Sequence, residues 1–419
     1  MKVLYITTAY PRNENDIITP WLVETIRRLQ NVGVTITVFT SSYAGLNDQI
    51  IFGTPVKRFR YFFARWERLT HEETAIDRVQ KGFLNKILAA CYLLFGTFAI
   101  WRFCRRNRFD IIHIHWPLPH FLFGYVASRV CKAPTVISFH GAELMAVKHR
   151  YKFLRPFLRW SIARANRITA NSNHTVKAIQ EIFHRPVDII PFGAGFTIPN
   201  TQNLCSERMD SSNSGWLNRQ GGAEGQGPKA EATKKILFVG RLVERKGVKY
   251  LIEATAILAR EKKVELHIVG QGPELPLLQK LTKQLALEDK VIFHGQVSTD
   301  ELRHHYQTCD VFVLPAVIDS KGDTEGLGVV IIEAMNYKKP VVASAVGGIT
   351  DLVINEKTGL TVPPGDSGAI AKAIKRLIEE PELASLLSQN AFEHIQANYS
   401  WNPIIARLFN LYQELLFHS

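Results

Sequence analysis

The chain has 419 residues, of which 46% are hydrophobic and 21% charged, a composition typical of a globular protein with two or three domains. It excludes a disordered chain and a small disulfide scaffold. The net charge of +13 is uneven, because residues 1–199 carry 27 Lys and Arg against 12 Asp and Glu, whereas residues 200–419 carry 24 against 26. The first half is therefore expected to lie near nucleic acid, an anionic membrane face or an anionic substrate.

Strand-like and helix-like runs alternate through the first half. The N-terminal run MKVLYITTAYP predicts a buried strand before a turn and not a signal peptide. A helix is predicted over residues 21–33, with Gly33 as its C-terminal stop. Further short strands are predicted over residues 34–40, 110–115, 134–140, 167–172 and 187–193. This alternation predicts a parallel, doubly wound sheet.

A long apolar run occupies residues 83–101, where Lys86 is the one charged residue. As a helix it would be about 28 Å long, just short of the roughly 30 Å of bilayer hydrocarbon. It lies between strands of one domain, so a membrane-spanning helix would split that domain. We expect a buried core helix, with contact to a membrane surface as the alternative and a true span as the least favoured interpretation.

Residues 148–167 combine seven Lys and Arg with four aromatic residues. Basic and apolar side chains on opposite faces of one helix are typical of an interfacial helix on anionic lipid. The alternative is a core helix with a solvated basic face.

A polar stretch separates two runs of alternating elements. Residues 200–233 are rich in Ser, Asn, Gln and Gly, and they predict a flexible linker or surface insertion. After it, strands are predicted over residues 234–240, 265–270, 291–295, 310–315 and 340–344. The cleft between two such domains is the expected ligand site. The predicted units are an N-terminal Rossmann-like domain (1–199), the linker (200–233), a C-terminal Rossmann-like domain (234–385) and C-terminal helices (386–419).

The strongest chemical signal is the motif EGLGVVIIE at residues 325–333, which follows a predicted strand. Gly326 and Gly328 are expected to open a helix whose free N–H groups and dipole suit a phosphate. Glu325 can accept hydrogen bonds from sugar hydroxyls, and Glu333 from a ribose. The alternative is a glycine-rich turn with two solvated glutamates.

A second signal is the motif GRLVERKG at residues 240–247, directly after another predicted strand. Arg241 offers a planar fork to phosphate oxygens and Lys246 a mobile charge. Two cations near a diphosphate would stabilise the charge that develops on a leaving group. The alternative is a pair of ordinary surface charges before a helix.

A third signal is the motif SFHGAE at residues 138–143, at the end of a predicted strand in the first half. This position singles out His140 among the 14 histidines, and it favours His115 in HIHWP less strongly. Gly270 and Gly272 lack the third glycine and the acidic residue of a dinucleotide fingerprint, so we expect a tight turn beside the ligand site.

No metal site is expected. The five cysteines are odd in number and form no C-x-x-C pair, which argues against a disulfide framework and a zinc site and favours a reducing compartment. Asp323 and Glu325 form a D-x-E pattern that resembles a metal motif, but Glu325 is already placed in the helix-opening loop.

Together these motifs resemble glycosyltransferase family 4, whose members have the GT-B fold. The resemblance is carried by HG, GRLVERKG, VGQGP, EGLGVVIIEAM, VVASAVGGITDLV and TGLTVPPGD in this order, and it extends over nearly the whole chain except residues 200–233. The stretch YPRNENDIITPW lacks the Gly-Gly loop of many members. It is more similar to the branch often met in bacterial surface-polysaccharide synthesis, of the colanic-acid type.

The resemblance implies two Rossmann-like domains facing across a cleft, with a nucleotide-sugar donor held by the C-terminal one. Transfer would be retaining and would need neither a metal nor another cofactor. Arg241 and Lys246 would hold the donor diphosphate, Glu325 the donor sugar and Glu333 the ribose, with His140 near the reacting carbon. The remaining donor contacts would come from Gly240, Gly270, Gly272, Gly326, Leu327 and Gly328. Acceptor-side candidates are Tyr10, His115, Trp116 and Glu143, and the final helix would cross back onto the first domain.

The sequence thus predicts a retaining glycosyltransferase that acts on a glycan or lipid-linked acceptor in cell-surface polysaccharide synthesis. We expect it to be cytoplasmic and peripheral on the inner membrane face, in contact with anionic lipid through residues 148–167 and also 83–101, with no nucleic-acid partner. A nucleotide-sugar epimerase of the same fold is the alternative, and a non-enzymatic binder of membrane or nucleic acid is a third hypothesis.

Overall fold

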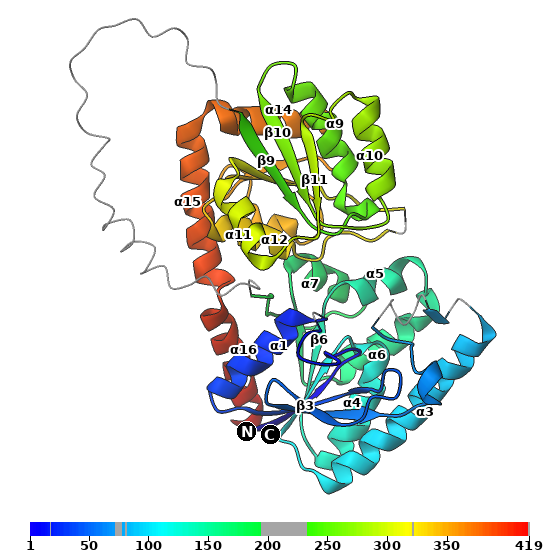
Figure 1. The fold of residues 1–419 in the computed structure, drawn as a ribbon. Helices are drawn as coiled ribbons and strands as arrows, with labels where there is room; N and C mark the ends of the chain where they lie inside the picture. The colour runs from blue at the N-terminus through cyan, green and yellow to red at the C-terminus, as the bar shows by residue number, and fades with distance from the viewer. Residues whose placement is uncertain (17, 72–77, 80–81, 194–232, 321, 418–419) are drawn as a thin grey trace, which may run out of the picture.

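The computed structural model of the chain contains two α/β domains, each built on its own largely parallel sheet (Figure 1). It describes all residues except 17, 72–77, 80–81, 194–232, 321 and 418–419. The predicted linker at residues 200–233 lies outside the described residues, apart from residue 233. The predicted fold class, two doubly wound Rossmann-like domains, is confirmed.

The first sheet has eight strands in the order β3-β4-β2-β1-β5-β6-β7-β8, and all neighbours are parallel except β3 and β4. Sequence analysis did not find β3 and β4, and it made the last strand too long. The strands are β1 (Lys2–Ile6), β2 (Thr35–Ser41), β3 (Gln49–Ile51), β4 (Thr54–Phe59), β5 (Ile111–His115), β6 (Thr135–Phe139), β7 (Arg167–Ala170) and β8 (Asp188–Ile189).

Helices cover both faces of this sheet, because successive side chains of a strand point to opposite faces. Leu4 and Ile6 of β1 belong to one core cluster, and Val3 and Tyr5 belong to another on the opposite face. The helices are α1 (Pro20–Asn31), α3 (Phe83–Arg106), α4 (Pro117–Cys131), α5 (Ala142–His149), α6 (Arg155–Arg164) and α7 (Asn173–Gln180).

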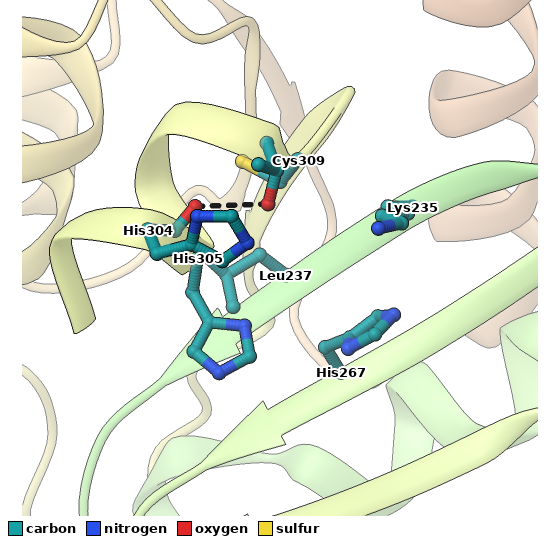
Figure 2. A pocket seen from close by; sticks show the side chains of 7 residues that line it. Lys235, Leu237, His267, His304, His305 and Cys309 are labelled. Carbon is teal, nitrogen blue, oxygen red and sulfur yellow. Dashed lines mark hydrogen bonds between the residues drawn. The ribbon is translucent and has the colours of Figure 1, made fainter. Parts of the chain in front are cut away.

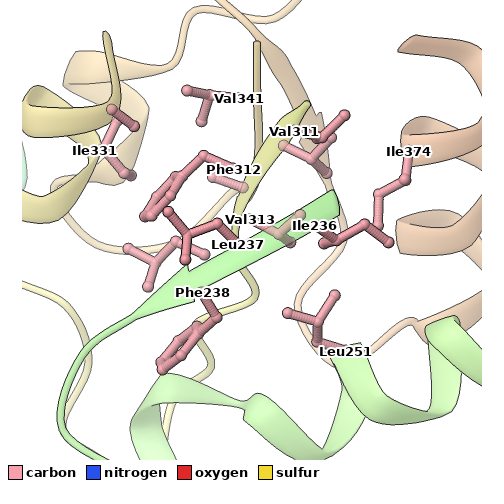
Figure 3. Close-up of a cluster of buried hydrophobic side chains, with 14 of the residues drawn as sticks. Ile236, Leu237, Phe238, Leu251, Val311, Phe312, Val313, Ile331, Val341 and Ile374 are labelled. Carbon is pink, nitrogen blue, oxygen red and sulfur yellow. The ribbon is translucent and has the colours of Figure 1, made fainter. Parts of the chain in front are cut away.

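The second sheet has six parallel strands in the order β11-β10-β9-β12-β13-β14. Its core is formed by aliphatic and aromatic side chains of β9, β12 and β13 with α9, α12 and α14 (Figure 3). The strands are β9 (Lys234–Val239), β10 (Val264–Val269), β11 (Val291–Gly295), β12 (Val311–Leu314), β13 (Val341–Ser344) and β14 (Leu360–Val362). The helices are α9 (Val248–Leu258), α10 (Leu275–Gln284), α11 (Thr299–Thr308), α12 (Val329–Asn336), α13 (Ile349–Leu352) and α14 (Ser367–Glu379).

The last two helices pack on different domains. Leu387 and Ile395 of α15 (Pro381–Asn398) belong to the core of the second domain. Leu408 and Leu411 of α16 (Trp401–Phe417) belong to the first domain's cluster, on the sheet face that α1 also covers. In Figure 1 these two helices run end to end along one side of both domains.

The apolar run at residues 83–101 is not the buried core helix that we expected. It lies within α3, which buries Leu88, Tyr92 and Ile100 on one side and packs against α4. The opposite side is open, with Leu94 68% and Phe98 56% exposed. The helix is long and apolar enough to cross a membrane, but it connects two strands of one sheet, so its packing places it on the domain surface.

Residues 148–167 do not form one helix. The segment contains the end of α5, a short 3-10 turn (Lys152–Leu154) and α6, which has Pro156 in its first turn. Proline favours the start of a helix and cannot donate a backbone hydrogen bond in its interior, so the chain turns here. Leu158 and Ile162 of α6 are buried in the core. The predicted continuous interfacial helix is therefore wrong.

A buried chain of hydrogen bonds fastens α16 to the first sheet. The Tyr412 hydroxyl lies 2.7 Å from the Tyr5 hydroxyl and 2.5 Å from His113 Nδ1. His113 Nε2 lies 2.7 Å from Ser138 Oγ, which lies 2.6 Å from Thr169 Oγ1. The chain thus joins α16 to β1, β5, β6 and β7.

Replacing Tyr412 tests this attachment. Tyr412→Phe leaves the buried Tyr5 hydroxyl and His113 Nδ1 without this partner, and we expect it to lower the free energy of unfolding by about 1–3 kcal/mol. Tyr412→Ala also opens a cavity and should cost about 3–5 kcal/mol. Calorimetry checks both, and a melting profile equal to wild type for Tyr412→Phe would show that the hydroxyl contributes nothing.

Candidate functional site

The loop after β9 presents Lys246 at the end of the second sheet. Lys246 is buried and ends a 3-10 turn (Glu244–Lys246) just before α9. The next residue, Gly247, has φ +65°, and a Cβ there would lie 2.0 Å from the Pro315 carbonyl oxygen. Only glycine fits a left-handed backbone this close to another loop. Gly247 therefore fixes the position of the preceding residue, Lys246.

Lys246 and Arg245 both form ion pairs with Glu325. The Glu325 carboxylate lies 2.5 Å from Lys246 Nζ and 3.0 Å from Arg245 Nη1. Burial would raise the pKa of Glu325, but the two neighbouring cations, Lys246 foremost, outweigh it and lower that pKa. The loop after β9 and the EGLG loop therefore bring two cations and an ionised carboxylate together. This arrangement can bind hydroxyl and phosphate groups side by side.

Of the two arginines in the motif GRLVERKG, Arg245 contacts Glu325, whereas the predicted diphosphate ligand Arg241 does not. The Arg241 side chain is exposed, and among the described residues it has no ion pair, whereas Arg245 contacts both Glu325 and Asp323. The motif GRLVERKG contains both arginines. Its spacing did not show which one lies beside Glu325, because that depends on the 3-10 turn that contains Arg245 and on the packing of the EGLG loop against it.

The predicted donor glycines line adjoining loops. A Cβ at Gly270 would lie 2.0 Å from the Gly240 carbonyl oxygen, and one at Gly272 would lie 2.2 Å from that of Leu242. The loops after β9 and β10 thus touch through their backbones. Gly326, Leu327 and Gly328 lead into α12, with Gly328 as its N-cap at φ +86° and Leu327 buried beneath.

Glu333 lies inside the domain, on α12. Its carboxylate accepts a 2.7 Å hydrogen bond from the Tyr306 hydroxyl, and its exposed fraction is 9%. Burial raises the pKa of Glu333 to about 7, although the bond from Tyr306 acts in the opposite direction. Tyr306 itself carried no signal in the sequence, because its place beside Glu333 depends on how α11 packs against α12.

The first domain contributes a cluster of rings around His140, which directly follows β6. His140 Nε2 lies 3.2 Å from His115 Nδ1, and the two imidazoles are stacked. The Trp116 and Trp21 rings lie 4.5 and 4.9 Å from the His140 ring, centroid to centroid. Burial, and then His115, lower the pKa of His140 well below its usual range, so its imidazole is neutral.

Sequence analysis missed Trp21 and Phe192. Phe192 lies 4.2 Å from Trp21 and 5.4 Å from His140, centroid to centroid. The proline before Trp21 begins α1. The Trp21 indole therefore lies at the start of this helix, beside His140 at the end of β6. A tryptophan at a helix start after the first strand is the signal that could have indicated it.

Polar atoms around His140 lack partners. Within the described part of the chain, His115 Nε2, His140 Nδ1 and Glu143 Oε2 are buried without a hydrogen bond. Glu143 Oε1 accepts from the His140 backbone N–H at 2.8 Å, and burial raises the pKa of Glu143 to about 7. Unpaired buried polar atoms are costly, and they are characteristic of sites that bind a polar ligand.

Tyr10 is fully buried in the first domain's core. Its side chain is not exposed at the domain boundary, although it was predicted on the acceptor side. Burial raises the pKa of its hydroxyl to about 12.

The two halves of the site meet at the domain boundary. A Cβ placed on Gly326 would lie 3.4 Å from the His140 carbonyl oxygen, so the EGLG loop of the second domain adjoins the end of β6. Close by, the Asp351 carboxylate accepts a 2.6 Å hydrogen bond from the Asn173 backbone N–H. The carboxyl ends of both sheets therefore face each other, where ligands of open α/β sheets bind.

Two family models match the chain in succession. The first, "Glycosyltransferase Family 4", matches residues 21–194, and the second, "Glycosyl transferases group 1", matches residues 223–394. They correspond to the two domains described above.

Individual proteins give the same result. A glycosyltransferase of Methanocaldococcus jannaschii, MJ1607, is 29% identical over 311 residues, which is 73% of this chain and 76% of that protein. The colanic acid biosynthesis glycosyltransferase WcaL of Escherichia coli is 35% identical over 192 residues, 45% of this chain and 47% of WcaL. The Anabaena protein HepE, solved in complex with UDP, aligns with a TM-score of 0.69 at 19% identity over 99% of this chain and 100% of HepE, a likeness of fold.

The raised pKa of Glu333 predicts a pH-dependent effect of Glu333→Gln. The unfolded carboxyl ionises near its usual pKa of 4.5 but the folded one only near 7, so stability falls as the pH rises from about 4.5 to 7. Glutamine keeps the acceptor for Tyr306 and removes this loss. We expect the variant to match wild type at pH 4 and to be more stable at pH 8, by up to about 3 kcal/mol.

Thermal melts of both proteins at pH 4, 6 and 8 measure the effect. A difference in melting temperature that does not change with pH would contradict the assignment of the proton to Glu333.

Proposed function

The chain belongs to the family 4 glycosyltransferases of GT-B fold, and we propose that it moves a sugar from a nucleotide-sugar donor to a glycan or lipid-linked acceptor with retention of configuration. The observation that carries the proposal is the position of the Lys246–Glu325–Arg245 cluster, whose EGLG loop adjoins His140 across the domain boundary. The two cations can bind a leaving diphosphate, and the Glu325 carboxylate can bind sugar hydroxyls. Both groups lie across the domain boundary from the neutral imidazole of His140.

On the donor side, we assign Lys246 and Arg245 to the diphosphate, with Arg241 at the exposed edge of the same loop. The backbone N–H groups at Gly326–Gly328 open α12 and add favourable dipoles. When a phosphate draws the cations away, the Glu325 carboxylate becomes free to accept from the donor sugar. Glu333 is assigned to the ribose. This set of charges supports transfer without a metal, because the cations themselves stabilise the leaving group.

On the acceptor side, His140 and His115 present unpaired ring nitrogens and Trp116 and Trp21 present flat apolar faces. Aromatic faces stack on sugar rings, and neutral imidazoles exchange hydrogen bonds with hydroxyls. In the proposed step the bond from the anomeric carbon to the diphosphate breaks, and the acceptor oxygen bonds to that carbon on the same face. Its proton passes to the departing phosphate oxygen.

Surface-glycan synthesis is the proposed setting. WcaL bears a name from colanic acid synthesis and HepE was solved with UDP, which supports a polysaccharide-type acceptor and a nucleotide donor. UDP-sugars and GDP-sugars are therefore the first donors to test.

Three substitutions test the site. We expect Glu325→Gln, Lys246→Met and His140→Ala each to lower kcat/KM for sugar transfer by about 100-fold or more, because each removes a charge or hydrogen bond at the reacting groups. Release of nucleoside diphosphate from UDP-glucose, UDP-galactose and GDP-mannose, with a membrane-glycolipid extract as acceptor, measures the rate.

Lys249→Met is the matched control, since Lys249 is an exposed lysine three residues further along, in the first turn of α9, and it should retain wild-type rates. Wild-type rates in all three site variants would contradict the assignment. An isomerised donor formed without acceptor would indicate an epimerase, and a product of inverted anomeric configuration by NMR would contradict retention.

We also propose that α3 docks the first domain on an anionic lipid surface at the inner face of the membrane. Leu94, Phe98 and Trp101 follow one another at helical spacing on its exposed side, and the stripe continues into Arg105, whose guanidinium lies over the Trp101 ring. Apolar side chains that end in aromatic and basic ones suit the boundary between acyl chains and anionic headgroups. The excess of basic residues in this domain also favours binding to an anionic lipid surface.

Vesicle sedimentation tests this surface. We expect the double variant Leu94→Asp/Phe98→Asp to bind phosphatidylglycerol vesicles at least about tenfold more weakly, since two large apolar side chains lose their burial in lipid. Leu386→Asp is the control, because Leu386 is equally exposed but lies on α15 of the second domain. Unchanged binding of the double variant would exclude α3 as the docking face.

A further inference from the structure

Three histidines of the second domain converge although they come from separate elements. His267 lies on β10, His294 on β11 and His305 on α11, and each offers a ring nitrogen within 4.8 Å of the other two. The His267 Nδ1 and His294 Nε2 atoms are 3.0 Å apart, and the His294 and His305 ring centroids are 4.3 Å apart. This trio lies outside the donor and acceptor groups described above.

The spacing of these nitrogens fits a single bound ion. Zinc binds imidazole nitrogen at about 2.0–2.1 Å, so the nitrogens of a tetrahedral site are about 3.3 Å apart. Without an ion, one N–H···N hydrogen bond can join the nitrogens of only two rings. Because the three nitrogens lie within 4.8 Å of one another, their separations have to shorten by no more than about 1.5 Å to reach this spacing.

The surroundings also suit a cation. Glu265 Oε2 lies 3.4 Å from His267 Nε2, the nitrogen that faces away from His294. A carboxylate on the outer nitrogen of a metal-binding histidine fixes the ring and makes it a better ligand.

We propose that His267, His294 and His305 bind one Zn²⁺ ion, which ties α11 and the edge strand β11 to β10. Two of the three rings, His267 and His305, also border a hollow that is shown in Figure 2 and has a volume of about 170 Å³, whereas His294 does not line it. A water molecule would complete the tetrahedral coordination as the fourth ligand. The ion holds α11 in place without taking part in sugar transfer.

The position of the ion relates it to the donor loops. Strand β11 ends at Gly295, whose carbonyl oxygen accepts a 2.8 Å hydrogen bond from the Gly270 N–H, in the loop after β10. From there the chain enters α11 through the Ser298 capping box. An ion that clamps α11 to both strands therefore fixes the connection that runs beside the donor loops.

Sequence analysis predicted no metal because the three residues share no short spacing. They are separated by 27 and 11 positions along the chain, with α10 between the first two and the start of α11 between the last two. Only the parallel pairing of β10 with β11, and the return of α11 over them, places the rings together.

Titration calorimetry with ZnSO₄ tests the proposal on the full chain, freed of any polyhistidine tag and stripped with a chelator. We expect one Zn²⁺ per chain and a higher melting temperature in its presence, because a ligand that binds only the folded state stabilises it. His294→Ala and His305→Ala should each weaken binding more than about 100-fold, and Glu265→Ala about tenfold.

His304→Ala is the matched control, since His304 is an exposed neighbour of His305 that lies outside the trio, and it should bind Zn²⁺ like wild type. Co²⁺ in place of Zn²⁺ should give the intense visible absorption of a four-coordinate site in wild type and His304→Ala alone. Absence of stoichiometric binding, or binding that survives both His294→Ala and His305→Ala, would overturn the proposal.

Discussion

The relative placement of the two domains depends on the buried hydrogen-bond chain that starts at Tyr412. Helix α15 packs into the second domain, and α16 follows it directly and is held to β1 and β5 of the first domain through that hydroxyl. Because α16 also fills an apolar face of the first sheet, the end of the chain fastens the two sheets with their loop ends facing each other. Polar groups this deeply buried tolerate few geometries, since each lost partner is costly.

This placement brings together groups that neither domain assembles alone. The second domain supplies the Glu325 carboxylate with Lys246 and Arg245, and the first supplies His140 with its aromatic neighbours. In our proposal, the two cations of the donor side neutralise one carboxylate and also bind the diphosphate of the donor. The side that we propose for the acceptor is apolar apart from the unpaired ring nitrogens of His115 and His140 and the Glu143 carboxyl group.

The net charge of +13 therefore has separate local origins. The nearly neutral second domain binds an anionic donor, in our proposal, with a few fixed cations, because a short-range site needs geometry more than a broad field. In the basic first domain, arginines lie at the end of the exposed stripe of α3, where they would contact the anionic headgroups of a lipid surface. The histidine trio is, in our proposal, a third type of site, which binds a metal cation.

Local chemistry in the sequence determined much of this protein. Alternating apolar runs defined both parallel sheets, and the glycines of GRLVERKG and EGLG defined tight loops at strand ends, because both depend on residues that are neighbours in the chain. Tertiary packing alone decided which arginine meets Glu325, that Tyr10 is buried, that α3 is open on one side and that Pro156 starts a separate helix. It also brought His267, His294 and His305 together, since side-chain contacts between distant segments follow from strand order and helix packing, which no local spacing encodes.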